Sequence, residues 1–220
     1  MTDPSTDPWL LYAGSRDRFI ALVRPLAAEL ADRTVPLTPG WTVAQVLAHV
    51  CGLNADLATG LREGLGTDER TSEQVGTRAG RSIDEICDEW LGHEEAVRAI
   101  IEGNGFLGRR LAADLVIHLH DVQHALGLPI DREDAATVDA GHTYATHTVD
   151  RWLETTGIEV AIELSDGSWF VPSACFEPPD LILRATPYDF LRSVSGRRSR
   201  AQVEGLDWSG DPGALIEHFS

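Results

Sequence analysis

The side chains best suited to metal binding are concentrated in one predicted helix, residues 107–126. Asp114, His118 and Asp121 fall within a sector of about 60° on that helix, because successive residues turn by about 100°. The i, i+4 spacing of Asp114 and His118 places their Cβ atoms about 5–6 Å apart, so that one cation can bridge both side chains. This helix therefore offers two candidate metal ligands on one face.

A third candidate ligand is His49, in a predicted helix over residues 43–62. It lies at the edge of the apolar stripe of that helix, from which it can point into the seam between helices. With Asp114 and His118 it makes a set of two nitrogen ligands and one oxygen ligand, which suits Zn²⁺ and also Ni²⁺ or Fe²⁺. Three protein ligands leave coordination positions open, as is typical of catalytic sites. The alternative is a hydrogen-bonded Asp–His pair, with His49 as an ordinary core histidine.

The remaining polar candidates are assigned no catalytic role beyond the metal site. His120 and His124 also stand four residues apart, but they project from the other side of their helix, where we expect them to face water. Cys51 is two residues from His49, so the two side chains diverge by about 160° and a buried thiol is expected. Asp121 either accepts the N–H of a metal-bound histidine or caps a neighbouring element.

All 18 basic residues of the chain are arginine. A Schiff base, a pyridoxal phosphate lysine and a Walker-type phosphate loop are therefore excluded, because each requires lysine. Arg197 and Arg198 are candidates for binding an anionic cosubstrate, since a guanidinium matches a carboxylate through two hydrogen bonds; the alternative is a solvated turn. The formal net charge of −17 disfavours nucleic acids and anionic membrane surfaces as partners.

The three cysteines are widely spaced and odd in number, which indicates buried thiols in a reducing compartment. Residues 1–9 lack the basic start and apolar segment of a signal peptide, and no apolar run approaches membrane-spanning length. We therefore expect a cytoplasmic protein that has no membrane partner.

The elements that must position these residues follow from the hydrophobic pattern. Helical periodicity predicts five helices, with Pro25 splitting or kinking the first, over residues 9–32, 43–62, 83–101, 107–126 and 135–154. Glycine-rich and polar residues 64–80 predict a long connection. Beyond residue 155 the pattern predicts strands over 158–164, 168–171 and 181–184, a candidate strand over 201–203, and short helices over 187–194 and 213–218.

Two segments and the tail of the chain resemble a known family. Residues 40–50, GWTVAQVLAHV, and 114–121, DLVIHLHD, resemble the signature segments of the DinB-like, mycothiol-dependent maleylpyruvate isomerase family, and residues 196–205 resemble its C-terminal domain. The resemblance implies a DinB-like four-helix bundle with an extra helix over 1–155 and a small sterol-carrier-protein-like α+β domain over 156–220. It carries the metal histidines of the family over to His49 and His118. Where the family has a glutamate, this chain has Asp114, one methylene shorter.

The activity implied by the resemblance is a metal-dependent isomerase or S-transferase that uses mycothiol, a sugar-linked cysteine thiol of actinobacteria. A coordinated thiol loses its proton and becomes a nucleophile. The implied partners are a small electrophilic substrate and this low-molecular-weight thiol, and the chain would be a monomer or homodimer. Two alternatives use the same residues: a non-catalytic binding or carrier module with a structural metal, and a metal-dependent hydrolase that activates water.

Overall fold

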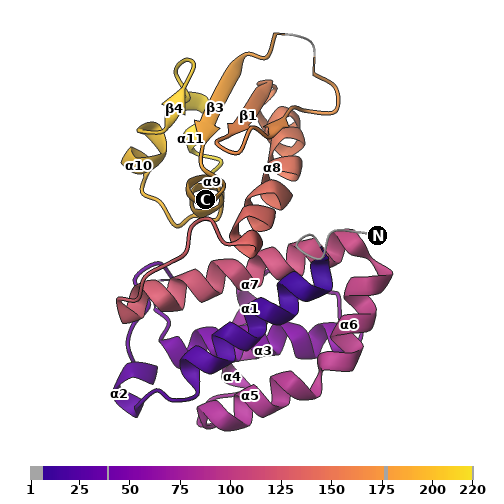
Figure 1. Cartoon of the computed structure of the whole chain (residues 1–220), viewed down its shortest axis with the longest axis vertical. Helices are drawn as coiled ribbons and strands as arrows, with labels where there is room; N and C mark the ends of the chain where they lie inside the picture. The colour runs from indigo at the N-terminus through magenta and orange to yellow at the C-terminus, as the bar shows by residue number, and fades with distance from the viewer. Residues whose placement is uncertain (1–6, 39, 176–177, 220) are drawn as a thin grey trace. The chain divides into compact units, whose positions relative to one another are not determined.

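The computed structural model describes residues 7–38, 40–175 and 178–219 (Figure 1). Residues 1–6 of the N-terminal segment and Pro39 of the predicted loop before Thr42 lie outside this description. The chain divides into two compact units, Met1–Ile130 and Asp131–Ser220. Among the described residues, no helix combines the length and the apolar content that crossing a membrane requires.

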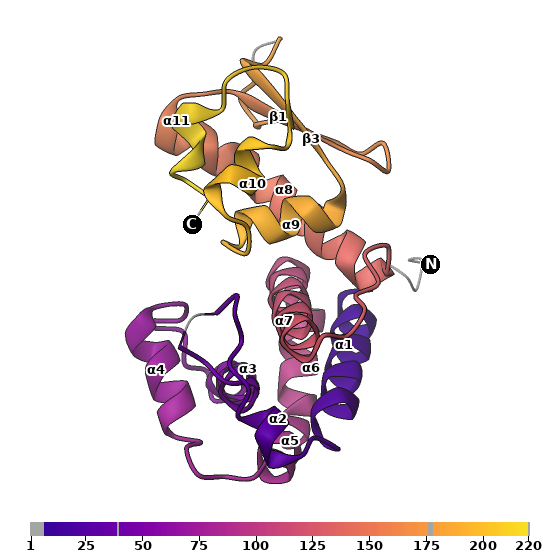
Figure 2. The same ribbon diagram turned by 90° about the vertical axis from the view of Figure 1, so that its left-hand side faces the viewer.

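The first unit is built from helices. They are α1 (Pro8–Val23), α2 (Ala28–Ala31), α3 (Val43–Ala58), α4 (Asp68–Gly76), α5 (Ile83–Gly92), α6 (Glu94–Gly103) and α7 (Gly105–Leu126). Pro25 separates α1 from α2, which confirms the predicted split at a residue that cannot continue a helix. α3 contacts α4, α5, α6 and α7, so it is the central helix of the unit (Figure 2).

Local signals set two helix ends close to the predicted site. At the start of α3, the backbone N–H of Gln45 donates to Thr42 Oγ1 (3.3 Å) and the N–H of Thr42 donates to Gln45 Oε1 (2.9 Å). This capping box fixes where the helix begins. α7 ends at Gly127, whose φ of 69° lies in the left-handed region that glycine adopts without strain. Both ends agree with the sequence prediction, although α3 stops at Ala58.

Two predictions for the first unit are wrong. Residues 64–80 are not one long loop but contain α4, which begins behind a side-chain cap from Thr67. The sequence of α4 has no apolar stripe that would reveal a helix, and the only residue that it buries is the polar Gln74. The helix predicted over 83–101 is divided into α5 and α6, and the break falls at His93, where ψ is 0°.

The second unit combines helices with a small sheet. Its elements are α8 (Ala135–Thr156), β1 (Val160–Leu164), β2 (Trp169–Phe170), β3 (Leu181–Ala185), α9 (Pro187–Val194), α10 (Arg200–Glu204), β4 (Asp207–Trp208) and α11 (Gly213–Ile216). The strand order is β2-β1-β3-β4; β1 is antiparallel to β2 and parallel to β3, and β3 is antiparallel to β4. A helical bundle followed by a small α+β portion confirms the predicted fold class.

The division between the units precedes α8, whereas the sequence pattern placed it after residue 155. Val149 and Trp152 of α8 share one buried core with Leu183 of β3 and Phe190 of α9. α8 therefore completes the core of the second unit. The periodicity of its residues predicted a helix correctly, but periodicity does not show which core a helix joins.

The candidate strand over residues 201–203 is wrong, because these residues belong to α10. Ser199 and Gln202 form a capping box, in which the N–H of Ser199 donates to Gln202 Oε1 at 2.9 Å. The sequence carried this helix-start signal. The strand that pairs with β3 is β4, where Trp208 lies opposite Leu183.

Candidate metal centre

The three predicted ligands, His49 from α3 and Asp114 and His118 from α7, lie together in the first unit. Each offers a ligand atom, and these atoms lie within 4.8 Å of one another. His118 Nε2 is 3.9 Å from Asp114 Oδ1, and the centroids of the two imidazole rings are 5.0 Å apart. Bonds of about 2.0–2.2 Å to one ion would require the side-chain ends to shift by about an ångström. Rotation of the side chains can supply such a shift, so the cluster fits one cation.

The cluster is partly shielded from water. His118 is 5% exposed, whereas His49 and Asp114 are half-buried. Trp41, in the loop before α3, covers one side of His49, with 5.1 Å between the ring centroids. Half-buried ligands would leave room for an external molecule to approach an ion bound there.

A polar side chain lies beside the Nδ1 atom of each histidine, and the one beside His49 is within hydrogen-bond distance, whereas His118 Nδ1 has no hydrogen-bond partner among the described residues. His118 Nδ1 is 3.5 Å from Asp121 Oδ2, and the Asp121 side chain is fully buried. His49 Nδ1 is 2.8 Å from Gln74 Oε1. Partners of this kind orient metal-bound imidazoles and direct the opposite nitrogen, Nε2, toward the ion. The Asp121 carboxylate lies on the Nδ1 side of His118, and its role as a histidine partner stays a prediction.

Gln74 belongs to a buried polar network that connects α4 to α3. Its Nε2 donates to Asp56 Oδ2 at 2.6 Å, and Arg70 Nε donates to the same oxygen at 2.8 Å. A second hydrogen bond joins Arg70 to Asp56 Oδ1. Burial alone would raise the pKa of Asp56, but the hydrogen bonds from Arg70 and Gln74 outweigh it, so this pKa lies below its ordinary value.

Sequence reasoning missed Gln74, Asp56 and Arg70. The only available signal was the start of α4, where Thr67 precedes two acidic residues in the first turn, a common pattern at helix N-termini. Recognising that helix would have placed Gln74 on an element that packs against α3.

The prediction that His120 faces water is wrong. His120 is 3% exposed, and its neighbours Val116 and Ile117 are buried too, so α7 buries more than one face. His124 is exposed, as expected. Cys51 is buried, and burial raises the pKa of its thiol to about 12, so it is a core thiol.

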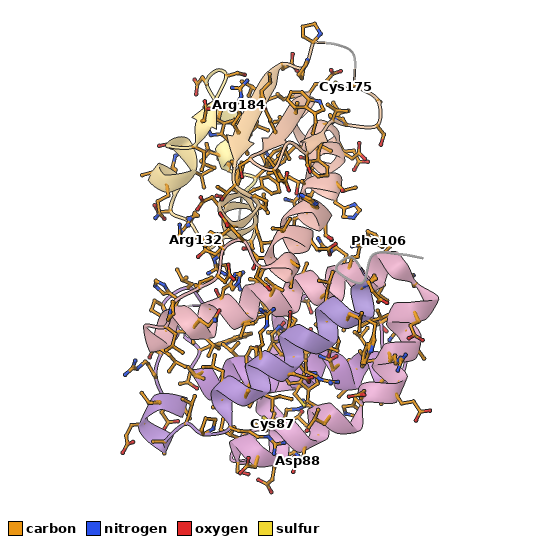
Figure 3. All side chains as sticks on the ribbon, in the orientation of Figure 1. Cys87, Asp88, Phe106, Arg132, Cys175 and Arg184 are labelled. Atoms are coloured by element: carbon orange, nitrogen blue, oxygen red, sulfur yellow. The ribbon has the colours of Figure 1, made fainter. Side chains whose placement is uncertain are left out.

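Arg197 and Arg198, the predicted contacts of an anionic cosubstrate, lie in the second unit between α9 and α10. Arg197 donates to the carbonyl oxygen of Ser195 at 2.5 Å, and Arg198 donates to Asp189 Oδ1 at 2.8 Å. The Arg198 guanidinium also lies 5.7 Å from the centroid of the Tyr188 ring; Arg132, labelled in Figure 3, lies 4.8 Å from the same centroid. Both predicted residues thus have contacts within the unit, and their role toward a cosubstrate stays a prediction.

The protein is a helical bundle that carries a cluster of two histidines and one carboxylate and is followed by an α+β portion. Residues 12–103 match the family described as mycothiol maleylpyruvate isomerase N-terminal domain. This match agrees with the resemblance seen in the sequence over the N-terminal part of the chain.

Two solved structures share the fold. One is the mycothiol-dependent maleylpyruvate isomerase (16% identity, TM-score 0.51), and the other is a histidine-to-alanine mutant with the same description (15% identity, TM-score 0.54). In both comparisons the similarity covers 94% of this chain and 93% of the other chain. No curated protein matches the sequence. At these identities the likeness establishes the fold.

Proposed function

We propose that this chain is a metal-dependent enzyme that uses mycothiol to isomerise a small electrophilic molecule or to transfer the thiol to it. The observation that carries the proposal is the cluster of His49, Asp114 and His118. His49 lies within residues 12–103, which match the family, and Asp114 and His118 follow in the next helix, α7. The solved relatives are described as mycothiol-dependent maleylpyruvate isomerases, which favours isomerisation.

The proposed ligand set suits a divalent ion, with zinc as the first choice and nickel or iron as alternatives. Two neutral imidazoles and one carboxylate carry a single negative charge, which leaves the ion able to attract an anion. A bound ion would lower the pKa of a coordinated thiol so that the thiolate is present at neutral pH. Asp114 is shorter than the glutamate typical of the family, and its position 3.9 Å from His118 Nε2 still places a carboxylate at the cluster.

The protein's own residues would hold and orient the reactants rather than attack them. Gln74 orients the His49 imidazole through a hydrogen bond, the Asp121 carboxylate lies beside the imidazole of His118, and the Trp41 ring limits access from one side. Burial raises the pKa of the thiols of Cys51 and Cys87, so neither is a thiolate at neutral pH. An external thiol therefore fits the site better than a nucleophile from the chain.

We also propose that Arg197 and Arg198 contact an anionic group of the cosubstrate. Arginine presents several N–H donors in a fixed plane, so a guanidinium that already holds one acceptor can bind a second. Replacing both by Gln should weaken mycothiol binding and leave the metal content unchanged.

Metal analysis followed by thermal unfolding with and without mycothiol tests the proposal. We expect about one divalent ion per chain in the wild type and its loss in a His49→Ala, His118→Ala double variant. Mycothiol should stabilise only the metal-loaded protein, by about 2.7 kcal/mol at 100 times its dissociation constant. Full metal content in the double variant would refute the site.

The desthiol analogue of mycothiol, which has the same sugar and no sulfur, distinguishes the alternative functions. We expect it to stabilise the metal-loaded protein less than mycothiol does. Equal stabilisation by the two, with or without metal, would instead indicate a carrier module. Hydrolysis of a substrate in the absence of any thiol would indicate a metal-dependent hydrolase.

A further inference from the structure

We propose that Gln74 is a positioning residue that selects the tautomer of His49 protonated at Nδ1, and that Asp56 and Arg70 fix Gln74 in the orientation this requires. The inference rests on the proposed metal site, because it explains how the lone pair of His49 comes to lie on Nε2. A continuous chain of hydrogen bonds runs from Arg70 through Asp56 and Gln74 to His49.

Arg70 sets the charge of Asp56. Arg70 donates two hydrogen bonds, one to each carboxylate oxygen of Asp56. Such a pairing favours the ionised carboxylate, and the lowered pKa of Asp56 agrees with it. Since Asp56 is only 5% exposed, its charge is stabilised by these hydrogen bonds and not by water.

Asp56 in turn sets the orientation of the Gln74 amide. An ionised carboxylate only accepts hydrogen bonds, so the group of Gln74 that lies 2.6 Å from Asp56 must be its NH₂. The amide oxygen then faces His49. This assignment follows from the chemistry of the partners.

Gln74 then determines which nitrogen of His49 carries the proton. The Gln74 oxygen, 2.8 Å from His49 Nδ1, can only accept, so Nδ1 must carry the hydrogen. In a neutral imidazole this leaves the lone pair on Nε2. Nε2 is then the atom able to bind a metal.

The packing around Gln74 keeps the amide from turning. Gln74 is 3% exposed, and Arg78 donates to its backbone carbonyl oxygen at 3.0 Å. At the adjacent position of α3, Gly52 presents no side chain, and a Cβ there would lie only 2.5 Å from Gln74 Cβ. The close approach of α4 to α3 is thus compatible with the hydrogen-bond chain only because residue 52 is glycine.

The direct test is the tautomer of His49 in the metal-free wild type, measured by ¹⁵N NMR of the imidazole nitrogens. We expect a protonated Nδ1 and an unprotonated Nε2. A His49 protonated at Nε2 would overturn the inference, whatever the protein does with metal. The measurement needs no variant and no bound ion.

Two variants test the consequence for metal binding, measured by competition with a chelator. Gln74→Met keeps the side-chain length but replaces the amide oxygen by a thioether, which is only a weak acceptor. Asp56→Asn allows the Gln74 amide to turn over. Each should shift His49 toward protonation at Nε2 and weaken metal binding about 10–100-fold, the usual effect of losing a partner of a metal-bound histidine.

Glu73→Gln is the matched control. It removes the exposed carboxylate of Glu73, the other group bonded to Arg70, and leaves the Asp56 contact in place. Metal affinity should therefore not change. Unchanged tautomer and affinity in both Gln74→Met and Asp56→Asn, with metal bound by the wild type, would refute the role of Gln74. Absence of metal from the wild type would refute the proposed function instead.

Discussion

Replacing Gly52 by alanine tests how closely α4 must approach α3. The added Cβ would lie 2.5 Å from Gln74 Cβ, 2.8 Å from Gln74 Cγ and 2.9 Å from a guanidinium nitrogen of Arg78. Gln74 Cβ is attached directly to the α4 backbone, so it cannot move aside by side-chain rotation. Reaching an ordinary carbon–carbon separation of about 3.5–4.0 Å requires α4 to move by about 1 Å.

The expected magnitude of Gly52→Ala combines opposing effects. Alanine in a helix interior is favoured over glycine by about 1 kcal/mol. Overpacking costs about 1–3 kcal/mol, and separating the buried Gln74 amide from its partners costs about 1–3 kcal/mol more. The free energy of unfolding should therefore fall by about 1–5 kcal/mol. Metal affinity should fall as well, because Gln74 moves away from His49.

Gly14→Ala is the control for this prediction. Gly14 is exposed within α1, and an added Cβ would meet nothing within 4 Å, so the same substitution should stabilise the protein by about 0.5–1 kcal/mol. Urea unfolding followed by circular dichroism measures both variants. If Gly52→Ala stabilises the protein as much as Gly14→Ala does, the close contact between α3 and α4 is not required.

Three further predictions concern the site and its surroundings. Asp114→Glu should retain the metal and Asp114→Asn should bind it more weakly, because an amide brings no charge; equal chelator-measured affinities for the Asn variant and wild type would exclude Asp114 as a ligand. His120→Gln should lower the free energy of unfolding by about 1–3 kcal/mol because His120 is buried, whereas exposed His124→Gln should change it by less than about 0.5 kcal/mol; equal urea midpoints would contradict this. The lowered pKa of Asp56 means that its carboxylate stabilises the fold above pH of about 4 and loses this effect as pH falls through the native-state value; the stability difference between wild type and Asp56→Asn should shrink there, and a constant difference from pH 7 to 3 would refute it.

The proximity of His49, Asp114 and His118 could be predicted from local features and from the resemblance. The spacing of Asp114 and His118 places both on one helical face, and the position of His49 beside an apolar stripe directs it toward another helix. The resemblance to a known family then joined the two segments. Neither spacing nor resemblance required knowledge of how the helices pack.

Gln74, the partner of His49, could not be predicted because its position depends on packing between helices. Gln74 lies in a segment whose polar residues resemble a loop, and only its contact with α3 shows that it is buried. The burial of His120 has the same cause, since one apolar stripe on α7 did not reveal that Val116 and Ile117 are covered as well. Hydrophobic patterns indicate which helices and strands form, but they do not show every face of a helix that becomes buried.

α4 is attached to its neighbour in an unusual way for a helix, because the single residue that it buries is a polar one. Most helices gain their stability from an apolar face, and segments with few buried apolar contacts open locally at a smaller free-energy cost than the whole domain. Opening of α4 would remove Gln74 from His49, so metal binding and the closing of α4 are linked equilibria. An ion bound through His49 would favour the closed helix, and slower exchange of the α4 amide hydrogens would report its presence from outside the coordination sphere.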